Sequence, residues 1–597
     1  MKTLKSRVQK TKSLISIKTY KKPQIFIVLL MLLINVVIVL VSALIAVSID
    51  DSYTSFFDAL TNGSIKWLLT PNAILQIVNP RTLILATFVL ITGMILFSGV
   101  IIALTTNLIR EYINNKKTSS GKLIIENHVI IINWNSKVSE LVSDLLYIEN
   151  KKINVVVISS ESKEYIEKHI LNALSRIKKQ SKFTNLNVLV KQADPLLKTN
   201  LTDISVEKAQ SIIIMNTSND LSDIEVIKNI LSLNNFKFDN NPSLVVEMKD
   251  INSTEKIETL NKVMTNLKDN KILPVVFDYR LGQIIAQTLI ESKIKDVYLS
   301  LFSFKDSEIY FIPNKKYDDV LNYYTHSIPL AENEAGTFVL SEDTDVVNKK
   351  TNTIINPIKL KINKINLSKD YSIYILGKNN KLNYILESLK GYQKVYSDSF
   401  SCSFIELEEL KNLVKKLNET NEKAKILLLS NEENTKESID ENVINALIYF
   451  EQYLKNENVE LIVELLNPKN EYIVSGFNIN NTIISNKLVS LLLSKFALFT
   501  KTTPYYDMLL SREATKNELP ISILLAKELI QTNFPLEFSS TKELIVSFYE
   551  SYKAKKIPIG VFRNDELIIF SNNLHEEKFT IYESDEIILI NIKKEAL

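Results

Sequence analysis

Glycine, histidine and cysteine are scarce in this chain of 597 residues, which contains 10 glycines, four histidines and one cysteine. Cys402 is the single cysteine, so an intramolecular disulfide is impossible and a secreted disulfide scaffold is excluded. The histidines are scattered and form no HxxxH or HExxH pair, which argues against zinc chemistry; they are His128, His169, His326 and His575. Glycine makes up about 1.7% of the chain against a usual share of roughly 7%, so motifs that need three glycines are disfavoured.

Neither sign of charge dominates, because the net charge is only +3, while 46% of the residues are hydrophobic and 23% are charged. A chain of this composition is not a disordered acidic or basic polymer, and it lacks the chain-wide basic footprint of a nucleic-acid-binding protein. We therefore expect no nucleic-acid partner. The length far exceeds the roughly 100–200 residues of one domain, so several domains are expected.

Two long runs without a charged side chain predict membrane spans at residues 25–49 and 82–109. At about 1.5 Å per residue, a helix over the first run exceeds a hydrocarbon core of about 30 Å. The second run lies between Arg81 and Arg110 and is also long enough to cross. A cleaved signal peptide is the alternative for the first run, but its apolar part exceeds the usual roughly 7–15 residues and no clear A-x-A site follows.

Basic side chains flank these two runs on one side. The N-terminal segment 1–23 carries eight lysine and arginine residues, and further basic residues follow the second run. The connecting segment has Lys66 alone against Asp50, Asp51 and Asp58. The positive-inside rule therefore places both termini in the cytoplasm, and we expect a multi-pass protein of the plasma membrane.

The segment between the two runs is too apolar for a plain hydrophilic loop and too short to cross a bilayer. A short helix from about Thr54 to Leu69, followed by a turn at residues 70–72 where proline cannot continue it, predicts a pore loop over residues 54–73. An amphipathic helix lying on the outer surface is the alternative. Residues 24–115 are thus predicted to form an α-helical membrane pore domain with two spans and a pore loop.

The remaining chain repeats itself, with one half at residues 122–365 and the other at 366–597. A buried-type strand at 128–133 runs into the opening of a helix, and the same construction returns at 371–377, where N-W-N-S-K-V aligns with G-K-N-N-K-L. Later echoes follow in the same order: 211–216 with 425–430, 244–248 with 461–465, and the apolar helix at 284–285 with 489–493. Strands alternating with helices predict a tandem pair of α/β Rossmann-like domains.

Short strands after the repeats predict small β-rich lobes, including a C-terminal subdomain at residues 535–597. Within it, a strand pair is predicted around a turn at Asn564–Asp565.

The strand–turn–helix elbows lack the glycines that hold a dinucleotide. The three fingerprint positions are occupied by Asn133, Asn135 and Val138 in the first copy and by Gly377, Asn379 and Leu382 in the second. Side chains there would crowd a pyrophosphate, so NAD is not expected at either site. A membrane-tethered oxidoreductase is therefore disfavoured. No nucleophile is paired with a base at a recognisable spacing, so we expect a protein that is not an enzyme.

These features together resemble one family. Two predicted spans with a pore loop between them are followed by G-K-x-I-I-E-x-H-V-I-I-I-x-W-N-x-K, at Gly121 to Lys137. This order of features resembles the CASTOR/POLLUX/SYM8 ion channel family. Further segments that agree lie at 204–214, 221–225, 245–248, 280–285 and 485–490. The resemblance implies tandem regulator-of-conductance (RCK) domains that form a gating ring, a homotetramer in a lipid bilayer, and permeant cations as partners.

The filter departs from related channels. There is no T-V-G-Y-G, so the carbonyl cage of a potassium filter is absent. The filter candidates lack the acidic residue that the resemblance implies, and they are Leu69, Thr70, Pro71, Asn72 and Ala73, with Asp58 in the pore helix instead. In the second span, Gly93 and Gly99 are candidate gate hinges, and close helix packing is the alternative reading of both.

Calcium is the regulatory ligand that the resemblance suggests. The candidate ligands are Asp220, Asp223, Glu225 and Glu247, with Asp220, Asp223 and Glu247 as the metal set, because carboxylates after neighbouring strands gather at one sheet edge. The alternative is that Asp220 and Asp223 cap the following helix.

The leading hypothesis is a calcium-modulated, tetrameric channel for monovalent cations, with calcium as a further candidate permeant ion. The alternative is a membrane-anchored sensor subunit of a cation transport system without its own pore.

Overall fold

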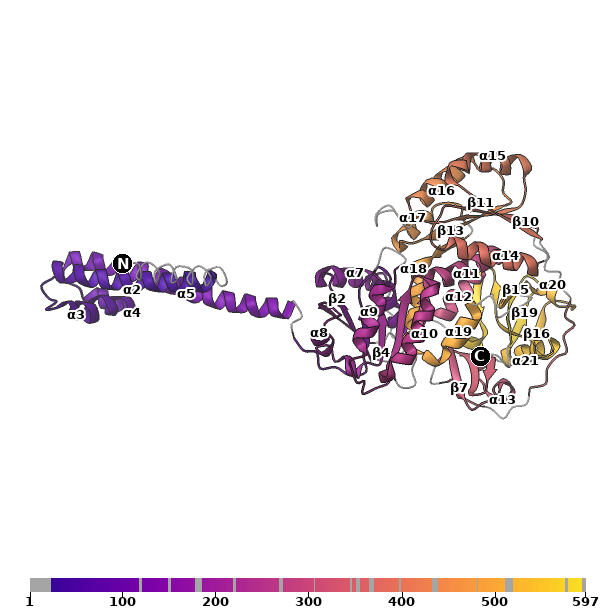
Figure 1. Cartoon of the computed structure of the whole chain (residues 1–597), viewed down its shortest axis with the longest axis horizontal. Helices are drawn as coiled ribbons and strands as arrows, with labels where there is room; N and C mark the ends of the chain where they lie inside the picture. Colours follow the sequence, from indigo (N-terminus) through magenta and orange to yellow (C-terminus); the bar gives the residue numbers. More distant parts are fainter. Residues whose placement is uncertain are drawn as a thin grey trace. The chain divides into compact units, whose positions relative to one another are not determined.

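The structure is a computed structural model, and it describes most of the chain in two compact units, residues 1–121 and 122–597 (Figure 1). The described residues are 23–117, 121–148, 152–177, 185–217, 222–267, 272–304, 307–343, 346–350, 355–363, 370–396, 399–431, 439–479, 481–510, 519–574 and 578–592.

The first unit consists of two long helices joined by a short helical segment. The long helices are α2 (Pro23–Ile49) and α5 (Pro80–Lys117). The connection contains α3 (Phe56–Asp58), the π-helix η1 (Ala59–Ile65), α4 (Lys66–Leu69) and the 3-10 helix η2 (Pro71–Gln76). The helix predicted to end at Leu69 does so, because Thr70 leaves the helical conformation and Pro71 follows it.

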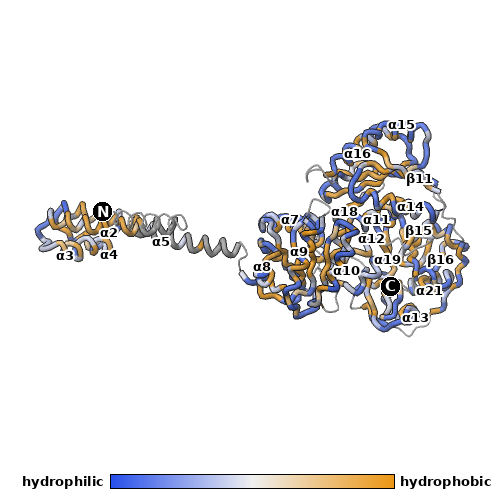
Figure 2. Tube along the Cα trace, viewed as in Figure 1, coloured by the Kyte–Doolittle hydropathy of each residue, from blue (hydrophilic) through white to orange (hydrophobic). Residues whose placement is uncertain are grey.

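Small side chains allow these helices to pack closely. Ala43 and Ala46 of α2, Ala59 of η1 and Ala86 of α5 are fully buried in one cluster, beside the nearly buried ring of Trp67. Large apolar side chains are instead exposed on both long helices. Figure 2 shows the apolar character of α2 along its trace. The exposed set includes Leu33, Val36, Leu44, Ile84, Phe88 and Ile95. The first unit is therefore apolar on its outside as well as in its core.

One of the two predicted spans is supported by length and composition. Among the described residues, Leu30–Ile49 is long and apolar enough to cross a membrane, whereas Pro80–Leu96 is a shorter apolar stretch within α5. The second predicted span is not confirmed by this criterion.

The second unit contains the predicted tandem of parallel sheets. The first sheet has the strand order β3-β2-β1-β4-β5-β6, which is the doubly wound Rossmann order. Its strands are β1 (Val129–Ile132), β2 (Lys152–Ser159), β3 (Asn185–Gln192), β4 (Ser211–Ile214), β5 (Ser243–Met248) and β6 (Ile272–Val276). Its helices are α6 (Lys137–Asp144), α7 (Lys163–Ser175), α8 (Lys198–Thr202), α9 (Ile224–Leu233) and α10 (Thr254–Val263).

The second sheet repeats this plan with one strand fewer. Its order is β11-β10-β12-β13-β14. Among the described residues, the second sheet therefore has no strand that corresponds to β3 of the first sheet. The strands are β10 (Tyr371–Leu376), β11 (Phe400–Ile405), β12 (Ala424–Leu428), β13 (Val459–Leu465) and β14 (Asn481–Ile484). The helices are α14 (Leu382–Val395), α15 (Leu410–Thr420), α16 (Glu441–Tyr453) and α17 (Glu471–Val474). The echoes predicted from the sequence correspond to β4 with β12 and β5 with β13.

The helix that follows each sheet packs against the opposite half. Helix α11 (Phe277–Ile290) follows β6 and lies against α14, where a Cβ on Gly282 would be only 2.7 Å from the Cβ of Tyr384. Helix α18 (Ser485–Leu498) follows β14 and contacts α6, with Ser490 Oγ donating to the carbonyl of Lys137 at 2.8 Å. This exchange joins the two halves into one continuous core.

The β-rich lobes follow the two exchanged helices. The first lobe contains α12 (Ile294–Phe302), α13 (Tyr317–Tyr323) and the antiparallel strands β7 (Glu308–Pro313), β8 (Ser327–Asn333) and β9 (Gly336–Ser341). The second contains α19 (Thr503–Leu510), β15 (Ile521–Leu525), α20 (Ala526–Leu529), β16 (Leu536–Phe538), α21 (Thr541–Ser551), β17 (Lys556–Arg563), β18 (Glu566–Ile569), β19 (Phe579–Ile581) and β20 (Glu586–Asn591).

Two details of the second lobe bear on the predictions. The turn between β17 and β18 lies at Asn564 and Asp565, as predicted, and both residues have positive φ, at 50° and 62°. The sheet, however, also includes β15, which pairs with β20. The lobe therefore begins before the predicted boundary at residue 535.

Candidate functional site

The first elbow is held by side-chain amides where a nucleotide-binding elbow has glycine. Asn133 has a φ of 71°, a left-handed conformation that asparagine tolerates better than most residues. Asn135 Nδ2 donates to the carbonyl of Asn216 at 3.1 Å and to Oε2 of Glu247 at 2.8 Å. Its Oδ1 accepts from the backbone N–H of Lys137 at 3.1 Å, which orders the start of α6.

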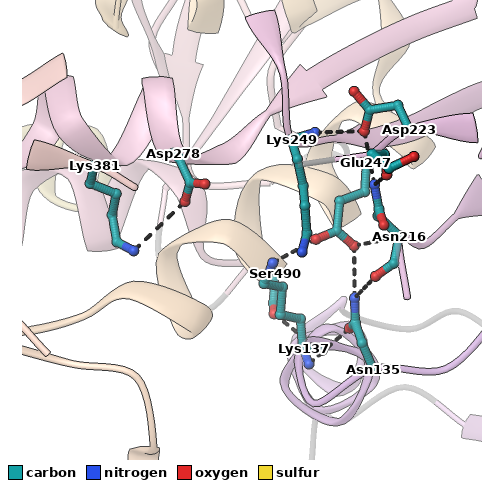
Figure 3. A network of polar contacts seen from close by, with 10 residues as sticks. Asn135, Lys137, Asn216, Asp223, Glu247, Lys249, Asp278, Lys381 and Ser490 are labelled. Carbon is teal, nitrogen blue, oxygen red and sulfur yellow. Dashed lines mark hydrogen bonds and ion pairs between the residues drawn. The ribbon is translucent and has the colours of Figure 1, made fainter. Parts of the chain in front are cut away.

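Glu247 is the centre of this network (Figure 3). It is the last residue but one of β5 and is fully buried. Its carboxylate accepts from Lys137 Nζ at 2.5 Å, from Asn135, and from the backbone N–H of Asn216 at 3.0 Å. A buried carboxylate is costly without partners, and these donors compensate for the loss of water around it. We call Asn135, Lys137 and Glu247 the first elbow network.

Asp223 joins two loops at the same sheet edge. Its carboxylate accepts from Asn216 Nδ2 at 2.8 Å and from the backbone N–H groups of Lys249 and Asp250 at 2.9 and 3.2 Å (Figure 3). Asp223 occupies the N-cap position of α9, but its side chain makes no capping hydrogen bond. Neither the calcium interpretation nor the capping alternative describes these contacts; Asp223 instead ties the end of β4 to the end of β5.

The other predicted calcium ligands are placed as follows. Glu225 accepts from Asn133 Nδ2 at 3.1 Å and from the hydroxyl of Thr217. Asp220 lies outside the described residues. Among the residues that the structure does describe, no group of three or more histidine, cysteine, aspartate or glutamate side chains is placed to hold a metal ion. The three described candidates therefore contact donors from the protein itself rather than one another.

The second half contains the same arrangement. Asn379 Nδ2 donates to Glu464 Oε2 at 2.7 Å and to the carbonyl of Ser430 at 3.0 Å, while its Oδ1 accepts from the N–H of Lys381 at 3.1 Å. Lys381 Nζ lies 3.4 Å from Glu464 and 3.7 Å from Asp278 of α11. We call Asn379, Lys381 and Glu464 the second elbow network.

The remaining members of the arrangement also correspond. Asp440 accepts from Ser430 Oγ at 2.6 Å and from the N–H groups of Leu466 and Asn467, as Asp223 does in the first half. Gly377 is left-handed like Asn133, with a φ of 88° against 71°, and a Cβ on Gly377 would be 2.5 Å from the carbonyl oxygen of Leu429. The sequence alignment of N-x-K with N-x-K contained this signal, but sequence reasoning assigned no role to Lys137, Lys381 or Glu464.

A second buried group of charges lies where three modules meet. Lys495 of α18 is 3.5 Å from Glu308 of β7, and its Nζ lies 3.6 Å from the centroid of the Phe304 ring. Asp144 of α6 accepts from Ser494 Oγ at 3.0 Å. Burial raises the pKa of Asp144 to about 7, and burial lowers the pKa of Lys495. Both effects have the same cause, because desolvation disfavours the charged forms.

The predicted pore and gate residues have structural contacts of their own. The Asp58 carboxylate accepts from the Thr54 N–H at 3.1 Å and from Asn62 Nδ2 at 2.8 Å, while the Asp58 N–H donates to the N-cap Ser55 at 3.2 Å. Ser55 therefore caps the short helix, and the Asp58 carboxylate bonds back to the residue before the cap. A Cβ on Gly93 would overlap Cδ1 of Leu68.

Gly99 differs from Gly93, since a Cβ there would meet no atom of the described residues within 4 Å. The close-packing alternative agrees with the contact of Gly93, and both glycines stay predictions as gate hinges. In the filter segment, Leu69 is exposed, Thr70 is the turn residue, and Pro71, Asn72 and Ala73 belong to η2. The Ala73 N–H donates to the Thr70 carbonyl at 2.9 Å, so this segment is a turn and a 3-10 helix rather than an extended strand.

The fold defines a class: a helical hairpin with a short helical connection, followed by tandem Rossmann-like sheets whose final helices are exchanged. No protein-family model matches the chain. It is 24% identical over 269 residues to the probable ion channel POLLUX of Oryza sativa subsp. japonica, an alignment that covers 43% of this chain and 26% of that relative. It is also 24% identical over 269 residues to the ion channel DMI1 of Medicago truncatula, covering 43% of this chain and 29% of DMI1.

A further relative is the ion channel CASTOR of Lotus japonicus, which is 23% identical over 284 residues, covering 45% of this chain and 31% of CASTOR. The curated homologues of this chain are thus ion channels of the POLLUX, DMI1 and CASTOR type, which confirms the resemblance found in the sequence. These alignments span less than a third of each relative's own length.

Solved structures with a similar fold include the GsuK channel, at 11% identity and a TM-score of 0.39 over 96% of this chain and 97% of GsuK. The human SLO3 gating ring is similar at 11% identity and a TM-score of 0.48, over 78% of this chain and 99% of that structure.

Proposed function

We propose that this chain is the subunit of a ligand-gated cation channel whose two cytoplasmic halves regulate a pore formed by the first unit. The homology to plant ion channels is the observation that carries the proposal. The build of the first unit supports it. A short helix is held between two long helices by the hydrogen bond from Ser42 to Ser64 and by the buried ring of Trp67. The apolar faces of α2 and α5 suit contact with lipid.

The assembly and the topology are part of the same proposal. The pore would be made by four copies in the plasma membrane, with both termini in the cytoplasm and monovalent cations as the permeant ions. A pore on a symmetry axis needs several copies, because the one short helix of each subunit cannot surround a conduction path. The proposal assigns the chain no enzymatic activity.

The elbow networks bear on the regulatory ligand. In each half, an asparagine and a lysine at the elbow contact a glutamate at the place where a Rossmann fold holds a pyrophosphate. A pyrophosphate there would face a carboxylate, so we propose that neither half binds NAD. Calcium is retained as the proposed regulatory ion. Its site is not assigned to Asp223 and Glu247, whose oxygens already accept hydrogen bonds within the protein.

Planar-bilayer recordings of the purified full chain test the proposal. Current should appear with potassium or sodium as charge carrier and should change with calcium on the cytoplasmic side. Gly93→Ala and Gly99→Ala form a matched pair, because the added methyl overlaps Leu68 at the first position and meets nothing at the second. We expect the first variant to alter conductance or open probability and the second to resemble wild type. Absence of current for every cation and calcium level would overturn the channel proposal in favour of the pore-less sensor subunit.

A further inference from the structure

A cavity of about 170 Å³ lies where the first half meets the exchanged elements of the second. One wall comes from β6 and the start of α11, with Leu273, Val276 and Arg280. The opposite wall comes from α18 and α19, with Phe496 and Asp507. None of these residues belongs to either elbow network. The cavity is therefore a separate feature of the junction between the halves.

The cavity contains one positive and one negative side chain, already facing each other. Arg280 Nη2 lies 2.5 Å from Asp507 Oδ1, and the guanidinium carbon lies 5.4 Å from the centroid of the Tyr279 ring. The side chain of Arg280 is 18% exposed and that of Asp507 is 46% exposed, so both remain within reach of a molecule that enters.

From these contacts we propose that the cavity binds a small zwitterion, namely an α-amino acid with an apolar side chain. The ligand carboxylate would pair with Arg280, and its ammonium would pair with Asp507. The apolar side chain would lie against Leu273, Val276 and Phe496.

Charge balance favours a zwitterion over a simple anion or cation. The charges of Arg280 and Asp507 cancel. An anion bound to Arg280 in place of Asp507 would leave the Asp507 carboxylate unpaired, and a cation bound to Asp507 would leave the Arg280 guanidinium unpaired. Partly buried charges left unpaired are costly, whereas a zwitterion gives each group a new partner. The size agrees, because about 170 Å³ is the room of roughly six water molecules, close to the non-hydrogen atoms of a small amino acid.

Such a ligand would contact both halves at once, since α11 follows the first sheet and α18 and α19 follow the second. Binding would stabilise the junction in the form seen here. The inference concerns binding alone and does not depend on whether the chain conducts ions.

Isothermal titration calorimetry on the full chain in nanodiscs tests the inference. L-valine is the probe, isovalerate is the analogue without the ammonium, and isobutylamine is the analogue without the carboxylate; L-alanine and L-leucine extend the size series. We expect at least one of the amino acids to bind and the two valine analogues to bind at least tenfold more weakly. No heat for any amino acid, or equal affinity for valine and its analogues, would overturn the proposal.

Two variants locate the binding. Arg280→Gln removes the positive charge of the cavity, and Asp507→Asn removes the negative charge at a half-exposed position. We expect at least tenfold weaker binding for each of the two variants. Thr259→Val, at an exposed site on α10 outside the cavity, is the matched control and should bind as wild type. Wild-type affinity in both cavity variants would overturn the assignment of the binding site to this cavity. If a variant fails to fold, the valine analogue series still tests the proposal, because it is measured on the wild-type protein.

Discussion

The Nζ of Lys137 lies 2.5 Å from Oε1 of Glu247, and the corresponding Lys381 and Glu464 lie 3.4 Å apart in the second half. Both glutamates are fully buried at the ends of corresponding strands, and both also accept from an elbow asparagine. The same ion pair thus recurs at the position where a nucleotide-binding Rossmann fold is open to a pyrophosphate. Its contribution to each half is structural, because it compensates a buried carboxylate.

Removing the cation from this pair should destabilise the first half. Lys137→Met leaves the Glu247 carboxylate buried with two neutral donors, and loss of one partner from a buried pair typically costs about 3 kcal/mol. The measurement is urea unfolding followed by the fluorescence of Trp134, which lies in the same elbow and is 8% exposed.

Lys415→Met is the control for this experiment. Lys415 pairs with Glu419 one helical turn away, and both side chains are largely exposed, at 76% and 66%. Such pairs contribute about 0.3–0.5 kcal/mol at most, so the unfolding midpoint should hardly move. An equal effect of the two substitutions would contradict the role assigned to the Lys137–Glu247 pair.

Gly282 should be required for the contact between α11 and α14. An added Cβ would lie 2.7 Å from the Tyr384 Cβ and 3.3 Å from the backbone nitrogen of Ile385, so Gly282→Val forces the helices apart and should cost about 1–3 kcal/mol. Hydrogen exchange should become faster in peptides from both helices. Gly476→Val, where the added Cβ meets only a carbonyl at 3.6 Å, should leave these peptides unchanged. Unaltered exchange in the Gly282 variant would show that the contact is not tight in solution.

Asp144 should make the protein less stable as the pH rises from about 5 to 7. Burial raises its pKa to about 7, above the ordinary value of 3.8, so the folded state binds a proton that the unfolded state has lost in this range. The free energy of unfolding therefore falls as pH rises through this window. Asp144→Asn retains an acceptor for Ser494 and should flatten the dependence, measured as urea midpoints at pH 5 and pH 7.

Asp319→Asn, at an exposed position on α13, is the control and should preserve the wild-type slope. The groups that face Asp144 are Lys495 and Glu308, which come from α18 and β7. If the Asp144 variant shows the same slope as wild type, another group accounts for the pH dependence.

Asp223 should stabilise the first half in the absence of calcium. Asp223→Ala removes the acceptor of two backbone N–H groups and of Asn216, and an unsatisfied buried donor costs about 1–3 kcal/mol. Melting temperatures of wild type and variant, each with and without millimolar calcium, provide the measurement. We expect the variant to melt lower by the same amount in both buffers. A calcium-induced stabilisation that is present in wild type and absent from the variant would return Asp223 to the metal site.

The sequence by itself determined the elements and the repeat. Runs of β-branched residues, the turn at Asn564–Asp565 and the proline after Leu69 act through local backbone preferences, which are visible one segment at a time. For the same reason the two halves could be aligned strand by strand, and the missing glycines of both elbows could be read directly.

Tertiary structure alone decided which side chains meet. Glu247 and Lys137 are 110 residues apart, and whether a carboxylate at a strand end faces a metal, a helix terminus or a lysine depends on where the neighbouring elbow lies. The exchange of α11 and α18 between the halves, the burial of Asp144 with Lys495, and the cavity beside Arg280 and Asp507 likewise arise from long-range packing. Packing of this kind is a property of the whole core, so no local pattern in the sequence predicted it.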